Sequence, residues 1–215
     1  MIRVVLFDAG DILYTRPRRG RRLREILDKA GVRGIDRSDP RWVALKKAAH
    51  IGALSERTYY TALVDLMGIE DPGLRREALD SFYEDQRDIE FTTGVRETLR
   101  QLKSDGYRLG IITNTIVPTR EKLRWFSEVG IDDVWDVFVT SCEVHCVKPD
   151  PRAYLMALEA VDALPREAVF VGHAREELLG AENVGMRALV FNYDDNASRF
   201  PVAASFSQIP VLVAR

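Results

Sequence analysis

The chain has 215 residues, with 31 Lys and Arg against 33 Asp and Glu, and a formal net charge of −2. This near balance excludes the strongly basic surface that a general nucleic-acid binder, or a protein attracted to anionic membranes, needs. The length predicts one main domain with a smaller addition. We therefore expect a protein that acts on a small molecule, as a monomer or a homodimer.

The cysteines and the apolar runs indicate the compartment. Cys142 and Cys146 are the only cysteines, and they stand too close together to join distant elements, so no disulfide framework is expected. The chain reaches Asp8 before a signal-type apolar stretch could form, and no run of about 18 apolar residues occurs. We expect a cytoplasmic protein without a membrane segment.

Short apolar runs predict a set of buried strands. The first runs from Arg3 to Phe7 and stops at Asp8, which is typical of a parallel strand that ends in a functional loop. Four similar runs follow, separated by amphipathic helical stretches: Leu109–Thr113, Val137–Thr140, Ala168–Val171 and Ala188–Phe191. The alternation predicts an α/β fold, a Rossmann-like parallel sheet with helices on both faces. In the tail we expect one last short strand, from Val211 to Val213.

Between Leu13 and Phe91 the strand signal disappears and helical periodicity replaces it. Four helical stretches are expected there: Leu23–Ala30, Trp42–Ala49, Thr58–Met67 and Leu74–Arg87. The sequence therefore predicts an inserted all-helical domain over residues 15–92, and an α/β core domain built from residues 1–14 and 93–215.

Polar side chains follow four of the predicted strands, where an α/β sheet binds its ligands. These residues supply a carboxylate nucleophile, a hydroxyl donor, a fixed cation and possible metal ligands, and they are Asp8, Thr113 with Asn114, Lys148, and His173 with Glu177. Such a set is suited to displacement at an anionic, phosphoryl-like centre.

Four segments also resemble the motifs of the haloacid dehalogenase-like (HAD) hydrolase superfamily. They are Phe7-Asp8-Ala9-Gly10-Asp11-Ile12-Leu13, Ile111-Ile112-Thr113-Asn114, Val147-Lys148-Pro149-Asp150-Pro151, and Phe170-Val171-Gly172-His173 with the following stretch to Met186. Their order, spacing and strand context agree over essentially the whole chain. The helical insertion between the first two motifs resembles the small cap domain of the family, which closes over the active site.

The resemblance implies a phosphatase that acts on a small phosphorylated metabolite. Asp8 would attack phosphorus to form an aspartyl-phosphate, which water then hydrolyses. Thr113 and Asn114 would bind the phosphoryl group, and Lys148 would neutralise its charge. The resemblance also implies Mg²⁺, held by Asp8, by the backbone carbonyl of Gly10 and by the fourth motif, where this chain has His173 and Glu177.

Two residues depart from the family pattern. Gly10 stands where phosphatases of the family usually carry an aspartate that protonates the leaving group, which favours substrates with good leaving groups. His173 replaces a metal-binding aspartate, and Mg²⁺ prefers oxygen to imidazole nitrogen, so metal affinity should be weakened. Glu177 lies one helical turn further and is the remaining acidic candidate.

Two other functions stay open from the residues. One is a catalytically impaired protein that binds a phosphate-like ligand. The other is a metal-independent 2-haloacid dehalogenase, in which Asp8 attacks carbon.

A basic run from Arg16 to Arg24 leads from the first motif into the insertion. Helix starts disfavour cations, so the run favours a functional use, namely the collection of a multiply charged substrate. The alternative is a solvated helix start.

Overall fold

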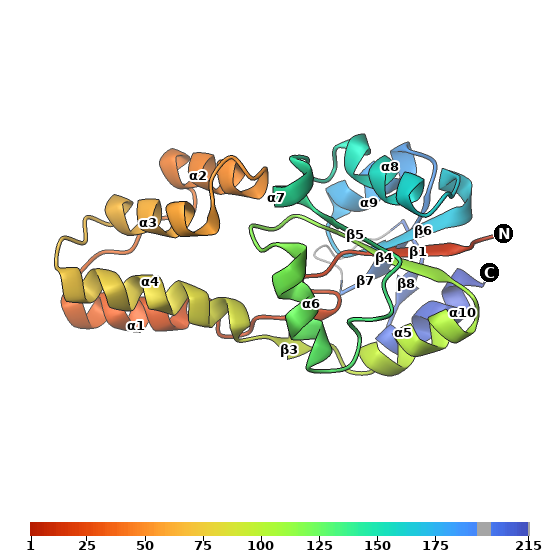
Figure 1. The fold of residues 1–215 in the computed structure, drawn as a ribbon, viewed down its shortest axis with the longest axis horizontal. Coiled ribbons are helices and arrows are strands. Elements are labelled where there is room, and N and C mark those ends of the chain that lie inside the picture. Colours follow the sequence, from red (N-terminus) through yellow and green to blue (C-terminus); the bar gives the residue numbers. More distant parts are fainter. Residues whose placement is uncertain (193–198, 215) are drawn as a thin grey trace.

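A six-stranded parallel sheet forms the centre of the protein in the computed structural model, which describes residues 1–192 and 199–214 (Figure 1). The strand order is β5-β4-β1-β6-β7-β8, so the first strand lies in the interior of the sheet. The bounds are β1 Val4–Phe7, β4 Arg108–Thr113, β5 Val137–Thr140, β6 Ala168–Gly172, β7 Arg187–Phe191 and β8 Val202–Ala203. The five core strands predicted from the sequence are confirmed, since no strand end differs by more than one residue.

Helices cover both faces of the sheet, because successive side chains of each buried strand point to opposite faces. On β1, Val5 and Phe7 belong to one apolar cluster, and Val4 and Leu6 belong to the other. The helices that pack on the first cluster are α5 (Val95–Ser104), α6 (Thr119–Ser127) and α10 (Ile209–Val213). Those on the second are α8 (Pro151–Ala160) and α9 (Arg175–Asn183), and the short α7 (Ser141–Val144) follows β5. The predicted Rossmann-like fold class is confirmed.

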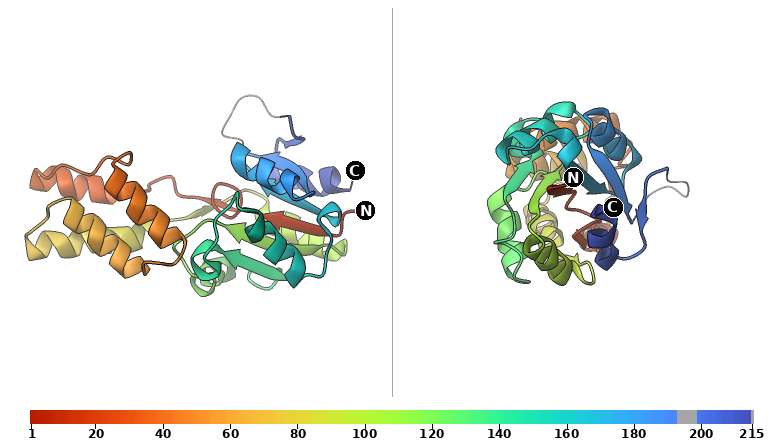
Figure 2. Two further views of the ribbon diagram at one scale, coloured as in Figure 1. Left: turned by 90° about the horizontal axis from the view of Figure 1, so that it is seen from above. Right: turned by 90° about the vertical axis from the view of Figure 1, so that its right-hand side faces the viewer.

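Four helices form an insertion that projects from the carboxyl ends of the strands (Figure 2). A short antiparallel pair, β2 (Tyr14–Thr15) and β3 (Glu90–Phe91), marks its two connections to the core. The helices are α1 (Arg21–Ala30), α2 (Pro40–His50), α3 (Glu56–Leu66) and α4 (Pro72–Arg87). Helix α1 packs on α4, and α2 packs on α3. No helix in the described part of the chain is both long and apolar enough to cross a membrane.

The C-terminal tail differs from its prediction. Val211–Val213, expected as a strand, forms the end of helix α10, so that prediction is wrong. Pro210 lies in the first turn of this helix, where its fixed φ angle suits a helix start. Ile209 and Val213, one helical turn apart, are both buried against the core. The last strand is instead β8, which pairs with β7, while residues 193–198 and 215 lie outside the described part.

Candidate active site

Asp8 stands at the carboxyl end of β1, between β4 and β6. Its backbone N–H donates to the carbonyl of Val171 at 2.9 Å, which extends the β1–β6 ladder by one residue. The backbone N–H of Ala9 donates to Asp8 Oδ1 at 2.7 Å. Behind it, Asp11 adopts a left-handed conformation with φ 60°, and its N–H donates to the carbonyl of Tyr14 at 2.8 Å. This tight turn fixes the carboxylate of Asp8 at the end of the sheet where the parallel strands reach their carboxyl ends.

The ammonium group of Lys148 lies between two carboxylates. Lys148 Nζ is 2.9 Å from Asp8 Oδ1 and 2.6 Å from Glu177 Oε2, and its side chain is 0% exposed. A buried cation with two buried anions is a costly arrangement unless the groups are held in place. The structure therefore brings together residues that are 140 and 29 positions apart in the chain (148 − 8 and 177 − 148).

Asn114 holds this triad in position. Its side-chain carbonyl accepts from the backbone N–H of Lys148 at 2.8 Å, and its Nδ2 donates to the Lys148 carbonyl at 3.0 Å. The same Nδ2 donates to Glu177 Oε1 at 3.3 Å. Asn114 thus orients both the lysine and the glutamate. The phosphate contact expected for Asn114 from the sequence stays a prediction.

Thr113, which is buried, ends strand β4 next to the site. In the parallel register Phe7 is opposite Ile111, so Thr113 extends one residue beyond the level of Asp8. Its hydroxyl is the donor that the sequence predicts for an incoming oxyanion.

The charges within the site decide the protonation states. Burial raises the pKa of Asp8, but the charge of Lys148 and hydrogen bonds from His173 and Lys148 outweigh burial and lower it to about 2. Burial lowers the pKa of Lys148, and the charges of Asp8 and Glu177 more than offset this, so the net direction is upward. Burial also raises the pKa of Glu177, against the opposing charge of Lys148. Asp8 is therefore a carboxylate, and Lys148 an ammonium, at neutral pH.

His173 is close to the second oxygen of Asp8. Its Nε2 lies 3.6 Å from Asp8 Oδ2, so the histidine, which stands where the resemblance implies a metal-binding aspartate, faces the carboxylate of Asp8.

The donor set does not fit Mg²⁺. Within residues 1–192 and 199–214, no group of three or more His, Cys, Asp or Glu side chains is arranged to hold a metal ion. Both oxygens of Glu177 contact Lys148 or Asn114, and Asp8 Oδ1 contacts Lys148, so an ammonium group occupies the space between the two carboxylates. The Mg²⁺ site expected from Asp8, Gly10, His173 and Glu177 stays a prediction that this geometry does not support.

Tyr154 is a further part of the site that the sequence reasoning missed. It lies on α8 six residues after Lys148, is fully buried, and donates its hydroxyl hydrogen to the Glu177 carbonyl at 2.7 Å. Gly180 leaves room for it, because a Cβ at that position would lie 2.8 Å from the Tyr154 oxygen. Two residues in the sequence could have indicated this contact, namely a tyrosine in the helix after the third motif and a glycine in the fourth motif.

A protein-family model and several known proteins resemble this chain. The sequence model of the family "Haloacid dehalogenase-like hydrolase" matches residues 43–191. A pyrophosphatase, PpaX, of Bacillus cereus (strain G9842) is 37% identical over 99 residues, and the PpaX of Bacillus mycoides (strain KBAB4) is 35% identical over 99 residues. Each match covers 46% of this chain and 45% of the relative, so the chain matches less than half the length of these relatives.

Solved structures share the whole fold. A 2-haloacid dehalogenase from Pseudomonas syringae pv. Tomato DC3000 has a TM-score of 0.73 at 24% identity, covering 100% of this chain and 99% of that one. A HAD phosphatase from Thermococcus onnurineus has a TM-score of 0.65 at 21% identity, with 99% and 98% coverage. The fold, the four strand-end motifs and the family match lead to one assignment. This chain belongs to the haloacid dehalogenase-like hydrolase family.

Proposed function

We propose that the protein is a phosphatase that hydrolyses a small phosphorylated compound through an aspartyl-phosphate on Asp8. The observation that carries the proposal is the buried ammonium of Lys148, which lies 2.9 Å from the carboxylate of Asp8. Both groups are at the carboxyl ends of the parallel strands. It keeps Asp8 ionised and places positive charge where an incoming phosphoryl group would need it. The similarity to pyrophosphatases supports phosphoryl transfer over other displacements.

The two carboxylate oxygens of Asp8 have different partners. Oδ1 is held by Lys148 at 2.9 Å and by the Ala9 N–H at 2.7 Å, whereas His173 Nε2 lies 3.6 Å from Oδ2, so Oδ2 is the less tightly held oxygen and the one proposed to attack phosphorus. As the new P–O bond forms, the bond to the leaving oxygen breaks and that oxygen takes the electron pair. Water then attacks phosphorus, the bond from phosphorus to Oδ2 breaks and returns its electron pair to the Asp8 carboxylate, and inorganic phosphate leaves; the proton that water loses passes to the departed leaving-group oxygen or to solvent.

Gly10 limits the range of substrates in this scheme. It carries no acid that could protonate the leaving oxygen, so we expect weakly basic leaving groups, such as phenolates, acyl groups or phosphates, to react fastest. The helical insertion, α1 to α4, would act as the cap that covers the bound substrate.

The test is hydrolysis of a panel of phosphate esters by the wild type, Asp8→Asn and Asp11→Asn. Asp11 is a matched control because it is exposed and lies in the same loop. We expect turnover to disappear in Asp8→Asn and to persist in Asp11→Asn. Equal turnover in the wild type and Asp8→Asn would overturn the proposal, and ligand-dependent stabilisation without any turnover would identify a binding protein instead.

A second candidate is a metal-independent 2-haloacid dehalogenase, which is favoured by the position of the Lys148 ammonium, since it lies 2.9 Å from Asp8 and 2.6 Å from Glu177 and offsets their charge without a metal ion. In that reaction Asp8 attacks carbon and halide leaves as an anion. Chloride release from 2-chloropropionate by the wild type, with no phosphate release from any ester, would select this candidate.

A further inference from the structure

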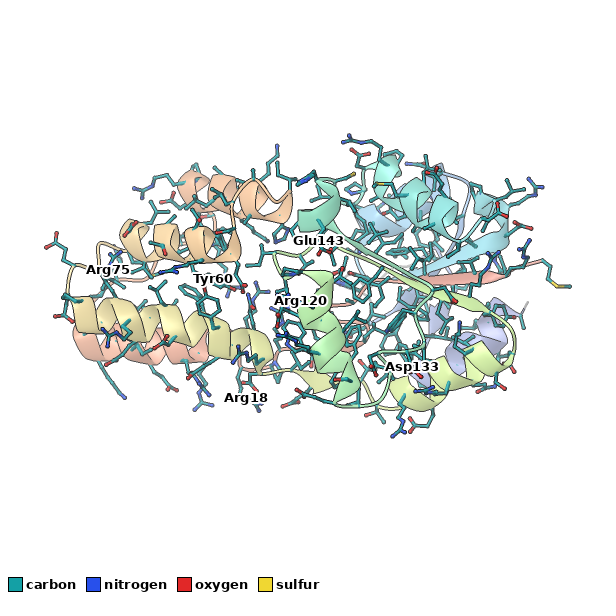
Figure 3. The ribbon with its side chains drawn as sticks, viewed as in Figure 1. Arg18, Tyr60, Arg75, Arg120, Asp133 and Glu143 are labelled. Carbon is teal, nitrogen blue, oxygen red and sulfur yellow. The ribbon has the colours of Figure 1, made fainter. Side chains whose placement is uncertain are left out.

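The insertion contacts the core at a second place, away from the two points where the chain enters and leaves it. Those points lie at the pair formed by β2 and β3, whereas the second contact joins α2 to the short helix α7. Figure 1 shows β3 and α7 on opposite sides of the junction between insertion and core. Figure 3 shows Glu143 of α7 near the end of α2. The insertion is therefore packed on the core as well as connected to it.

The backbone on both sides brings this contact close. His145, directly after α7, adopts φ 56°, and its Nδ1 lies 2.8 Å from the carbonyl oxygen of Ile51. Nδ1 is the donor, because a carbonyl oxygen can only accept. Gly52 has φ +70°, and a Cβ on it would lie 2.1 Å from the Cys142 carbonyl oxygen. These four residues, Ile51, Gly52, Cys142 and His145, are called the docking contact.

Helix α7 is in turn bonded to the loop that follows β4. The Oγ of Ser141 accepts from the backbone N–H of Thr115 at 2.9 Å and donates to the carbonyl oxygen of Thr115 at 3.1 Å. Both residues are buried, and Thr115 Oγ1 accepts from the N–H of Val117 at 3.0 Å. One serine side chain therefore fixes both backbone groups of the residue next to Asn114.

The same loop also contacts the insertion directly. Ile116 packs against an apolar cluster of α2 and α3 that contains Ala49, Tyr59, Tyr60 and Leu63. Figure 3 shows Tyr60 between α3 and α4. The loop after β4 is therefore held both by α7 and by the insertion.

The two segments that the insertion contacts also carry residues of the active site. Asn114 stands directly before Thr115, and Lys148 stands three residues after His145. The side chain of Asn114 binds both backbone groups of Lys148, at 2.8 and 3.0 Å. A continuous series of contacts thus joins the docking contact to the ammonium group beside Asp8.

We propose that His145 and Ser141 are positioning residues, through which the docking of the insertion on α7 holds Asn114 and Lys148 in place. This inference rests on the proposed phosphatase function, because Lys148 has its role there. When the insertion is docked, α7 and the loop after β4 are both supported, and Lys148 is held at Asp8. When it is undocked, both segments lose a support next to the site. Covering the substrate and completing the site are thereby coupled.

The first test measures hydrolysis of p-nitrophenyl phosphate after removal of the Ser141 hydroxyl. Ser141→Ala should lower kcat about three- to tenfold, the range that corresponds to about one net hydrogen bond, and change KM less than twofold. Ser81→Ala is the matched control, since both serines are 2% exposed and Ser81 Oγ donates to the Ala78 carbonyl within α4. The control should keep the wild-type kcat. An unchanged kcat in Ser141→Ala would overturn the inference.

The second test compares His145→Asn with His145→Gly. Both new residues tolerate φ 56°, but only asparagine keeps an N–H donor at the position of Nδ1. We expect a kcat near the wild-type value for His145→Asn and a loss of about three- to tenfold for His145→Gly. Equal kcat values in these two variants would show that the hydrogen bond to Ile51 has no positioning role.

A double variant tests whether the two residues act through one series of contacts. His145→Gly combined with Ser141→Ala should lose less kcat than the product of the two single losses, because the second change affects a series that is already broken. A loss equal to the product would mean that the residues act independently, and it would overturn the inference.

Hydrogen exchange tests the coupling even if no ester is hydrolysed. In His145→Gly the backbone amides of residues 115–117, outside the docking contact, should exchange faster than in the wild type, while Ser81→Ala leaves them unchanged. Faster exchange confined to residues 51–53 and 141–146 would overturn the inference and leave the phosphatase proposal intact. Faster exchange at residues 115–117 in a protein without hydrolysis would support the coupling and overturn the phosphatase proposal alone.

Discussion

Removal of the Lys148 ammonium is the sharpest test of the active-site geometry. In Lys148→Met the side chain keeps a similar length, but two buried carboxylates, Asp8 and Glu177, lose the cation that lies 2.9 and 2.6 Å from them. Breaking a buried ion pair from one side costs about 3 to 5 kcal/mol, because the remaining charge stays buried and unpaired. The depression of the Asp8 pKa from 3.8 to about 2 corresponds to about 2 to 3 kcal/mol at about 1.4 kcal/mol per pH unit, which agrees in scale.

The cost of Lys148→Met in unfolding free energy should depend on pH, and the pKa shifts of the carboxylates predict the direction of that dependence. In the wild type the folded-state pKa of Asp8 lies below its unfolded value, so its stabilisation is present above about pH 4 and is lost as the pH falls towards 2. In Lys148→Met, burial without the cation raises the folded-state pKa values of Asp8 and Glu177. The penalty is then fully present at neutral pH and is relieved as the carboxylates become protonated near pH 4.

The assay is urea unfolding of both proteins at pH 7 and near pH 4. We expect a difference of about 3 to 5 kcal/mol at pH 7 that becomes smaller near pH 4. Lys103→Met is the matched control, because Lys103 Nζ lies 2.8 Å from Asp136 but both side chains are about one third exposed, and its loss should cost less than about 1 kcal/mol. Equal costs for the two variants, or a Lys148→Met cost that does not change with pH, would refute the buried triad.

Three further predictions follow from individual contacts. Chelation of divalent ions should leave the thermal midpoint of the wild type unchanged, whereas His173→Asp should acquire stabilisation by Mg²⁺; a metal-dependent midpoint in the wild type would contradict the donor geometry. Gly52→Ala should cost more than about 2 kcal/mol, because the residue has φ +70° and the new Cβ would lie 2.1 Å from the Cys142 carbonyl oxygen. Gly68→Ala, with φ +67° and no atom within 4 Å, should cost only about 1 kcal/mol, and thermal unfolding compares the two. Asn114→Ala should lower kcat without unfolding the protein, as measured by steady-state kinetics beside circular dichroism, because Lys148 and Glu177 lose their common hydrogen-bond partner; an unchanged kcat would show that Asn114 does not position them.

The central sheet could be predicted from the sequence because parallel strands covered on both faces are continuous apolar runs. Val4 to Phe7 are all fully buried, and the chain turns polar at Asp8, so the strand end and the candidate nucleophile appear together in the sequence. The tail was harder, since Val211 to Val213 has the composition of a strand, and only the position of Pro210 and the packing of Ile209 show that it is a helix. The two-residue strands β2 and β3 depend on a pairing between residues 14–15 and 90–91, which no local pattern records.

The site could be predicted as a set of residues but not as a set of contacts. Strand order places Asp8, Lys148 and Glu177 at one sheet edge, and this much follows from the motifs. Whether a lysine or a metal ion lies between the carboxylates depends on how the side chains of Asp8, Lys148 and Glu177 meet in the folded site, and no local sequence pattern records those contacts. The ion pairs of the basic run from Arg16 to Arg24 could not be predicted for the same reason, because the partners of Arg18 and Arg22 are Asp88 and Glu84, at the C-terminal end of the insertion.

The nitrogen groups around Asp8 offer a physical reason for the departure from the family pattern at position 173. Lys148 contacts Oδ1 of Asp8, and the imidazole of His173 faces Oδ2, so both oxygens of the carboxylate already have a nitrogen neighbour. An aspartate at position 173 would add a third carboxylate to Asp8 and Glu177, and a divalent ion would then be needed to balance them. With histidine there, no third carboxylate is added, and the ammonium of Lys148 lies 2.9 and 2.6 Å from the two carboxylates that remain. Mg²⁺ would have to displace the Lys148 ammonium from between the two carboxylates, and Gly10 offers no acid beside them, so we expect the preferred substrate to supply a good leaving group itself.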